Sequence, residues 1–210
     1  MEIGDLFPAT DFDQWAASYD RDVLDEAHFP FLGYQRALET VVRLAEAKPG
    51  MRVLDLGAGT GNLAAAFARL GCRVWGTDFS ESMLVQARLK LPQVTFFLAD
   101  LRHELPPELP GSFDRIVSAY VFHHFDLSQK VQLVKKLARR LTPDGRMVVA
   151  DIAFRDWSAL QQVKQAVGED WEDEFYWLAA EVIPAFEEAG LEVSFTPVSD
   201  MAGVFLIHLV

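Results

Sequence analysis

The sequence is 210 residues long, half of them hydrophobic, with 31 acidic and 19 basic side chains and a net charge of −12. This length is enough for one globular domain with a sizeable core. Because so negative a surface repels phosphate backbones, nucleic acid is disfavoured as a partner. No apolar run approaches the roughly 20 residues of a membrane span, and residues 1–8 lack the pattern of a signal sequence.

Cys72 is the single cysteine of the chain. The sequence therefore offers neither a disulfide framework nor the cysteine spacing of a metal site. We expect a cytoplasmic protein in a reducing compartment, without a membrane partner and without a bound metal. No repeat, low-complexity tract or linker divides the chain.

The chain is expected to be helical up to residue 47. Residues 12–32 form a leader rich in aromatic side chains, for which we expect one or two short helices. An amphipathic helix over residues 33–47 follows, and Pro49 and Gly50 end it.

From Met51 onward, short apolar stretches alternate with amphipathic ones. Ser80 is expected to cap one of the helices, and Thr142 to Gly145 are expected to form a turn. Such alternation predicts a mainly parallel sheet with right-handed crossovers and helices on both faces. The pattern predicts strands over 51–56, 73–77, 94–99, 113–118 and 146–151, and helices over 62–70, 81–90 and 128–141.

After Asp151 the pattern changes. Helices are expected over 156–167 and 169–189, and Pro184 either begins the second of these or kinks it. The last two strands, 191–197 and 203–210, are joined too closely for a crossover, so they should pair as an antiparallel hairpin.

A glycine-rich turn follows the first strand. The stretch from Val53 to Leu63 passes from a buried strand through Gly57, Gly59 and Gly61 into a helix. Glycine is needed where the backbone turns with positive φ or lies directly against a ligand. The helix N-terminus adds unpaired N–H groups and a partial positive charge. We predict a cradle for a small ligand, at the edge where open α/β sheets bind their cofactors.

The residues around this turn favour a nucleoside cofactor. Asn62 stands where the dinucleotide fingerprint has its third glycine, which disfavours NAD(P) and flavin dinucleotides. Asp78 ends the second strand, where a carboxylate can accept both hydroxyls of a ribose. Asp100 ends the third strand and can accept from an adenine amino group, while the Leu101 backbone N–H faces a ring nitrogen.

These stretches together resemble the class I S-adenosylmethionine-dependent methyltransferases, and most of all a small bacterial subgroup, the YrrT-like proteins. The resemblance covers the chain from about Phe12 to the final hairpin. It rests on Val53 to Gly61, Gly76 to Asp78, Ala99-Asp100, Phe113 to Ser118, Tyr120 to His124, Leu141 to Gly145, Glu188 to Leu191 and the Trp15-Ala-x-x-Tyr-Asp leader.

The resemblance implies a Rossmann-like three-layer α/β sandwich, with a seven-stranded, mostly parallel sheet closed by a C-terminal antiparallel hairpin. It divides a single domain, residues 1–210, into three parts. A helical lid or leader occupies residues 1–47, a cofactor-binding half residues 48–153, and a helical insertion with the terminal hairpin residues 154–210.

The resemblance also implies S-adenosylmethionine as cofactor, with S-adenosylhomocysteine as product. Asp78 would hold the ribose, Phe79 and Met83 would lie beside the adenine, and Asp100 and Leu101 would bind it. Ser118 and Ala119 would lie next to the sulfonium. The methionine part would be held by Asp55, Gly57, Ala58, Gly59, Thr60 and Gly61.

Methyl transfer needs the nucleophile, the methyl carbon and the sulfur held in line, and a base only if the nucleophile arrives protonated. His123, and after it His124, are the candidate bases, because neutral histidine near pH 7 suits this role. The alternative is a histidine that only orients its loop. Neighbouring residues at a strand end point to opposite sides, so only one of the pair is expected to face the pocket.

Four further residues are expected on the substrate side. Trp15 and Tyr19 either form part of a lid or only pack the leader onto the domain. Tyr120 follows the fourth strand, and Asp151, which ends the fifth, either orients the substrate or caps the next segment. The acidic and aromatic segment 168–177 either selects a cationic or amphipathic substrate or forms an amphipathic helix with a solvated acidic face.

We expect a small-molecule acceptor, with an oxygen, nitrogen, sulfur or carbon nucleophile. The competing interpretations are an NAD(P)-dependent oxidoreductase on a similar sheet and a protein that binds S-adenosylmethionine without catalysis. The sequence carries no signal for oligomeric state.

Overall fold

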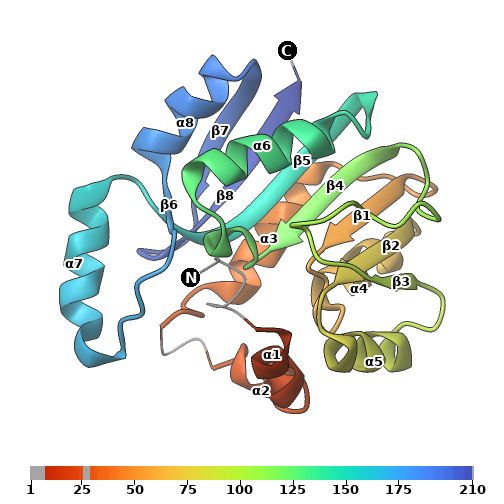
Figure 1. Ribbon diagram of the computed structural model, residues 1–210, viewed down its shortest axis with the longest axis horizontal. Helices are drawn as coiled ribbons and strands as arrows, with labels where there is room; N and C mark the ends of the chain where they lie inside the picture. The colour runs from red at the N-terminus through yellow and green to blue at the C-terminus, as the bar shows by residue number, and fades with distance from the viewer. Residues whose placement is uncertain (1–7, 26–28, 210) are drawn as a thin grey trace.

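The structure, a computed structural model, describes residues 8–25 and 29–209, and a mostly parallel sheet runs through its centre (Figure 1). The strand order is β3-β2-β1-β4-β5-β8-β7, and β6 pairs with β5 beside this path. Strands β7 and β8 are antiparallel to each other, and β8 is antiparallel to β5. The strands are β1 (Arg52–Leu56), β2 (Arg73–Asp78), β3 (Thr95–Leu98), β4 (Phe113–Ala119), β5 (Leu141–Phe154), β6 (Trp177–Leu178), β7 (Leu191–Pro197) and β8 (Ala202–Leu209).

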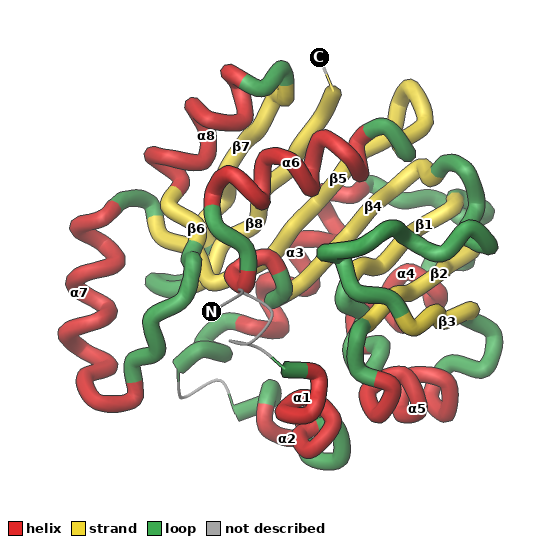
Figure 2. Tube along the Cα trace, viewed as in Figure 1, coloured by secondary structure: helices red, strands yellow, loops and turns green. Residues whose placement is uncertain are grey.

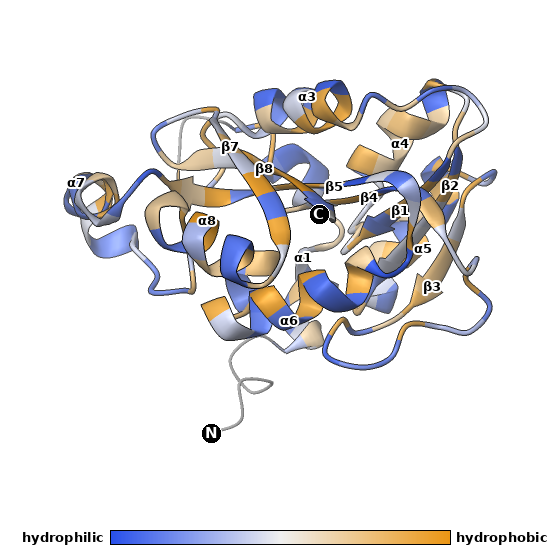
Figure 3. Cartoon of the chain, turned by 90° about the horizontal axis from the view of Figure 1, so that it is seen from above, coloured by the Kyte–Doolittle hydropathy of each residue, from blue (hydrophilic) through white to orange (hydrophobic). Residues whose placement is uncertain are grey.

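Helices cover both faces of this sheet, so the predicted three-layer α/β architecture and its closing hairpin are confirmed. Figure 3 shows α3 (Tyr34–Ala45) and α4 (Asn62–Arg69) on one side, with α6 (Leu127–Ala138) and α8 (Ala179–Glu188) on the other. Helix α5 (Glu81–Lys90) packs with the α3 side. Strand side chains alternate accordingly, so that Val117 joins the core under α3 and Ile116 the core under α6.

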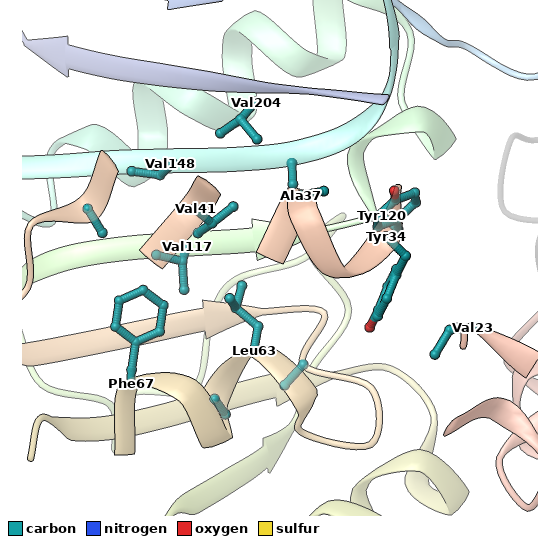
Figure 4. Packing of buried hydrophobic residues seen from close by; sticks show 14 of the residues in the cluster. Val23, Tyr34, Ala37, Val41, Leu63, Phe67, Val117, Tyr120, Val148 and Val204 are labelled. Atoms are coloured by element: carbon teal, nitrogen blue, oxygen red, sulfur yellow. The ribbon is translucent and has the colours of Figure 1, made fainter. Parts of the chain in front are cut away.

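The core under α3 fixes the helix that follows the glycine turn. Figure 4 shows Val41 of α3 and Phe67 of α4 on either side of Val117, and all three side chains are fully buried. Burying a side chain of this size contributes about 1.5–3 kcal/mol. Helix α4 is therefore held firmly against the sheet, with its N-terminus at the end of β1.

Two short helices of the leader, α1 (Ala9–Trp15) and α2 (Tyr19–Asp22), lie near the carboxyl ends of the parallel strands. Helix α7 (Trp157–Val167) stands at the left edge of Figure 1. None of the helices in the described part of the chain combines the length and the apolar character that crossing a membrane requires.

Several helix boundaries follow the predicted caps. Ser80 begins α5, and its side chain accepts a hydrogen bond from the Met83 backbone N–H at 3.1 Å. Helix α6 begins one residue earlier than predicted, because Asp126 and Gln129 form a capping box at its start.

The predicted start of the strand 146–151 is wrong, because β5 already begins at Leu141. Leu141 pairs with Phe113 and Arg146 with Arg115, so residues 142–145 lie opposite Asp114 alone and form the predicted turn as a bulge within β5. A Cβ at Gly145 would lie 2.8 Å from the Thr142 carbonyl oxygen, which shows how tight this turn is. At its other end β5 continues past Asp151, since Ile152 pairs with Ala202 of β8. Asp151 therefore lies inside the strand rather than at its end.

The predicted helix over residues 169–189 is also wrong in its first half. A single 3-10 turn, η3 (Gly168–Asp170), is followed by a loop that runs up to β6. Figure 2 shows no helix in this loop. Trp171 in this loop stacks on Phe29 at 5.2 Å between ring centroids, so aromatic packing replaces helical hydrogen bonding. Pro184 lies inside α8, which begins at Ala179, so it does not start the helix.

Candidate functional site

Two adjoining cavities lie at the carboxyl ends of the parallel strands. The strand-edge cavity, of about 90 Å³, is formed by the turns after β1 to β4; the leader cavity, of about 480 Å³, lies between the leader and residues 170–174. Phe12, Tyr19, Tyr120 and His124 line both, so the two cavities share a wall.

The strand-edge cavity collects most of the residues predicted to bind a cofactor. The predicted residues that line it are Gly57, Gly59, Asp78, Phe79, Met83, Asp100, Leu101 and Ala119. Those behind the lining are Asp55, Ala58, Thr60, Gly61 and Ser118. Ser118, predicted to lie next to a sulfonium, is fully buried and its hydroxyl donates to the Leu56 carbonyl at 2.7 Å. It braces β4 against β1, and Ala119 and Tyr120 form the wall instead.

The glycine turn has the left-handed backbone that its sequence predicts. A Cβ at Gly57 (φ +64°) would lie 2.2 Å from a Val121 methyl group, so only glycine fits there. A Cβ at Gly59 (φ +52°) would meet no protein atom within 4 Å. Gly59 therefore faces open space, and this is the backbone approach that a bound ligand requires.

Asp78 is almost fully buried at the end of β2. Its Oδ2 accepts from the Gly59 N–H at 2.8 Å and its Oδ1 from the Ser80 N–H at 2.9 Å. Burial raises the pKa of Asp78 to about 6, against the lowering effect of these backbone N–H groups. Because each oxygen has a second lone pair, the carboxylate can still accept from a ligand in the cavity.

Asp55 lies beneath the turn, in the interior of β1. It is 1% exposed, and within the described chain neither carboxylate oxygen has a hydrogen-bond partner. Burial, and to a lesser extent the Asp78 carboxylate, raise the pKa of Asp55 to about 8, while the nearby Ala64 backbone N–H, too poorly placed for a full hydrogen bond, opposes the rise. A buried acid of this kind is sensitive to any positive charge that binds nearby.

Asp100 has a partner that the sequence interpretation missed. Arg102 donates from Nε to both Asp100 oxygens, at 2.9 and 2.8 Å, and its guanidinium also lines the strand-edge cavity. Burial raises the pKa of Asp100, but the hydrogen bonds and charge of Arg102 outweigh it and hold the pKa below its ordinary value. Asp100 is thus a fixed, ionised acceptor.

Two leader carboxylates hold α1 and α2 onto the helices that flank the site. Asp13 accepts from the Ser80 hydroxyl at 2.6 Å and from the Ser82 N–H at 3.2 Å, at the start of α5. Asp20 accepts from the Thr60 hydroxyl at 2.5 Å and pairs with Lys90 at 2.6 Å. The Tyr-Asp pair of the leader motif is the sequence signal for Asp20, whereas nothing in the sequence distinguished Asp13.

His123 and Asp151 form a buried dyad beside the leader cavity. His123 Nδ1 lies 2.5 Å from Asp151 Oδ1, and the His123 backbone N–H donates to Oδ2 at 3.0 Å. The Trp177 indole N–H also donates to Oδ2 at 3.0 Å, which fixes the carboxylate. Burial lowers the pKa of His123, but the charge and hydrogen bond of Asp151 outweigh it and raise the pKa above its ordinary value.

The expectation that only one of the two histidines faces a pocket is wrong. Both lie in a 3-10 turn, η2 (Phe122–His124), rather than on an extended strand, and their ring centroids are 4.1 Å apart. His123 lines the leader cavity and His124 lines both cavities. Burial, together with the neighbouring His123, lowers the pKa of His124 to about 2, so His124 stays neutral and is the weaker base.

Glu174 faces both histidines from the loop that precedes β6. Its carboxylate oxygens lie 3.7 Å from His123 Nε2 and 3.7 Å from His124 Nδ1. The ligand atoms of these three residues all lie within 4.8 Å of one another. The buried Lys130 ammonium donates to the Phe125 and Phe175 carbonyls and so joins the two backbone segments that carry these side chains. The sequence analysis singled out the segment 168–177, which carries Glu174, but not Glu174 itself, and it missed Lys130.

Tyr120 occupies the shared wall with a strained backbone. Its φ of +58° is left-handed, which costs a non-glycine residue roughly 1–3 kcal/mol. Its ring packs on Tyr34 at 5.2 Å and on Phe31 at 5.9 Å between centroids. Trp15 and Tyr19 of the leader line the same leader cavity, and their rings are 4.7 Å apart. The other predicted substrate residue, Asp151, is fully buried and acts on this cavity only through His123.

The whole arrangement can hold a nucleoside-like ligand in the strand-edge cavity and a second molecule in the leader cavity. His123 Nε2 is the basic atom at the second cavity, since Nδ1 is occupied by Asp151.

Comparison with known proteins shows which family the chain belongs to. A family model described as a methyltransferase domain matches residues 53–145. An uncharacterized methyltransferase of Geobacillus thermodenitrificans is 36% identical over 197 residues, which cover 88% of each chain. One of Bacillus pumilus is 35% identical over 205 residues, covering 92% of this chain and 93% of its own.

Solved structures share the fold at lower identity. A magnesium protoporphyrin IX methyltransferase from Synechocystis, with bound S-adenosylhomocysteine, has a TM-score of 0.72 at 22% identity and covers 98% of this chain and 97% of its own. A putative methyltransferase in complex with the Haloferax volcanii Trm112 activator has a TM-score of 0.70 at 21% identity, covering 94% and 96%.

Proposed function

This chain belongs to the class I S-adenosylmethionine-dependent methyltransferases, and we propose that it methylates a small molecule bound in the leader cavity. The observation that carries the proposal is the wall shared by the two cavities. A volume of about 480 Å³ falls in the range of about 300–1,000 Å³ that is usual for small-molecule sites.

The residues of the strand-edge cavity fit the cofactor. Bound S-adenosylmethionine supplies a sulfonium, whose methyl carbon is electrophilic. Gly59 leaves open the space that a close-lying ligand needs, and Asp78 and Asp100 present carboxylate oxygens at the cavity wall. Phe79 and Met83 add apolar surface suited to an adenine. We assign the methionine part to the glycine turn, the ribose to Asp78 and the adenine to Asp100 and Leu101.

The chief task of the protein in this reaction is to position the acceptor. Ala119 and Tyr120 form the wall at the junction of the cavities, where the acceptor would meet the methyl carbon. Holding reactants in line can supply roughly 7–11 kcal/mol of the barrier. The strained backbone of Tyr120, held by its packing on Tyr34, makes this wall rigid.

His123 is the base for an acceptor that arrives protonated. The carboxylate of Asp151 holds the proton on Nδ1, so that Nε2 is the atom free to take a proton from the acceptor. His124, with its low pKa, contributes a neutral surface to both cavities.

Neither the structure nor the family supports the alternative of an NAD(P)-dependent oxidoreductase. Asn62 replaces the third glycine of the dinucleotide fingerprint, and its side chain donates to Asp20 at 3.1 Å. It therefore anchors the leader and does not make room for a pyrophosphate.

A labelled-methyl experiment tests the proposal. The protein is incubated with methyl-labelled S-adenosylmethionine and a cell extract divided into low-molecular-weight, protein and nucleic-acid fractions. Label is expected in the low-molecular-weight fraction, whereas label confined to protein or nucleic acid would contradict the proposal. A thermal-shift comparison of S-adenosylhomocysteine with NAD(P) supplies the control for the cofactor.

A further inference from the structure

We propose that the acceptor is an amine that enters the leader cavity as an ammonium cation, is held by Glu174, and is deprotonated by His123. This inference rests on the proposed small-molecule methyl transfer and adds the chemical class of the acceptor and the atom that is methylated.

The charge of the leader cavity has one sign. Four of its lining residues are acidic, namely Asp11, Asp170, Glu172 and Glu174, and no Lys or Arg stands among the lining residues of the described chain. An anionic acceptor would therefore be repelled, and a neutral one could gain hydrogen bonds from these groups but no attraction between opposite charges. The segment 168–177 holds a 3-10 turn and a loop in place of the predicted helix, and three of its carboxylates, Asp170, Glu172 and Glu174, line the cavity.

Glu174 is the carboxylate that points to a specific ligand. Its side chain is only 11% exposed, and within the described chain it makes no hydrogen bond that would compensate for its burial. Its two histidine neighbours lie 3.7 Å away, beyond hydrogen-bonding distance. A buried carboxylate in this state gains most from a cation with N–H donors.

His123 is the second, independent observation at the same place. The residue is 93% buried, since its exposed fraction is 7%, and it lines the leader cavity. Its Nδ1 is held by Asp151, while its Nε2 makes no hydrogen bond to any described residue. A proton acceptor and an anion thus converge on one point of the cavity wall.

Aromatic rings complete the environment of a cation. Six of the lining residues carry aromatic rings, namely Phe12, Trp15, Tyr19, Phe29, Phe31 and Tyr120. The faces of such rings attract ammonium groups, most strongly when the site is shielded from water. They also suit an acceptor that carries an apolar or aromatic body.

The reaction balances with these groups. One N–H bond of the ammonium breaks, and its proton passes to His123 Nε2. The freed nitrogen lone pair forms the new N–C bond, while the C–S bond breaks and its electron pair stays on sulfur. The products are a methylated ammonium, S-adenosylhomocysteine and one proton, which His123 returns to solvent.

The first experiment measures binding, without turnover. The full chain is titrated with 2-phenylethylamine, a cation at pH 7, and with its neutral and anionic counterparts, 2-phenylethanol and 3-phenylpropanoate, by calorimetry. We expect the amine to bind at least about tenfold more tightly than the alcohol. Glu174→Gln should remove this preference, whereas Glu169→Gln, a neighbouring acid outside the cavity lining, should keep it. Absence of any preference for the cation overturns the inference.

The second experiment identifies the labelled product from a low-molecular-weight cell extract. A labelled product that is basic and carries the methyl group on nitrogen supports the inference. A neutral or acidic labelled product overturns it and leaves the proposed function standing. If no small molecule is labelled, the proposed function fails, and the inference fails with it.

A third experiment, with the chelator EDTA, distinguishes an ammonium ligand from a metal ion. This control is needed because the ligand atoms of His123, His124 and Glu174 also have the spacing of metal ligands. Amine binding and labelling are expected to be unchanged by EDTA. Loss of both with EDTA, and recovery with Zn²⁺, would assign the three side chains to a metal and overturn the inference.

Discussion

The two cavities are built in different ways. The strand-edge cavity is made by backbone turns at the ends of four neighbouring strands, and its key feature is the space left open at Gly59. The leader cavity is made by side chains from the leader, from η2 and from the loop before β6, which are distant in sequence. A cavity made by strand-end turns suits a ligand that a whole family shares. A cavity made by side chains of the leader and loops can change its residues without disturbing the sheet.

Deletion of residues 1–20 is the change that we expect to affect the leader cavity most. The truncation deletes Trp15 and Tyr19 together with Asp13 and Asp20, so the leader cavity loses one wall, while the strand-edge cavity loses Phe12 and Tyr19 but keeps its turns. We expect turnover to be abolished while the core stays folded, as measured by methyl transfer and by a circular-dichroism melt. Full activity of the truncated chain would show that the leader is no lid.

Substitution of the proposed base should affect only the leader cavity. For His123→Gln we expect the turnover number to fall about 10²- to 10⁴-fold, because the proton acceptor is lost. The affinity for S-adenosylhomocysteine, measured by calorimetry, should be unchanged, since His123 lies outside the strand-edge lining. Unchanged turnover would remove His123 from the mechanism.

The pH profile gives the same test without removing the histidine. His123 must be neutral to act, so kcat/KM should rise as pH increases through its pKa, which Asp151 and Glu174 raise and Lys130 lowers. Asp151→Asn removes a charge that raises this pKa, so the acid limb should move to lower pH while the plateau falls. An acid limb that stays in place would exclude His123 as the titrating group.

A methyl group at Gly59 should act on the strand-edge cavity alone. For Gly59→Ala we expect at least about tenfold weaker binding of S-adenosylhomocysteine, and a loss of roughly 1–2 kcal/mol in the free energy of unfolding from the left-handed φ. Gly50→Ala is the matched control, because Gly50 also has a positive φ (+85°) and open space. It should carry the same strain and bind normally; equal binding by both variants would mean that no ligand approaches Gly59.

The smallest effect is expected at Arg102. Arg102→Gln leaves the Asp100 acceptor in place, so the affinity for S-adenosylhomocysteine should change by less than about threefold, whereas Asp100→Asn should weaken it about tenfold by turning an acceptor into a donor. Calorimetry of the two variants compares them directly. A larger loss for Arg102→Gln would make the guanidinium a direct contact.

The strand-edge cavity could be predicted from the sequence because its residues follow strands one after another. Asp78 ends β2, while Gly57 and Asp100 follow β1 and β3 within two residues, and parallel strands bring their carboxyl ends to one edge. The leader cavity could not be predicted, because its contacts join residues far apart in sequence. Asp13 and Ser80, for example, are 67 residues apart, and no periodic pattern links them. The same holds for Glu174, whose loop is fixed by aromatic packing in place of the predicted helix.

The packing of Phe12 has a consequence for the order of events. Its ring lies edge-on to Phe79, 5.0 Å between centroids, and close to His124 at 5.8 Å, inside the strand-edge cavity. With Phe12 there, about 90 Å³ remains, less than the roughly 300 Å³ of small ligand sites. A cofactor bound in this cavity would need the volume that Phe12 occupies, so we expect the leader to lift before the cofactor enters. The measured affinity would then be the intrinsic affinity multiplied by the fraction of molecules with the leader lifted, so the leader would set how much cofactor the cell must supply.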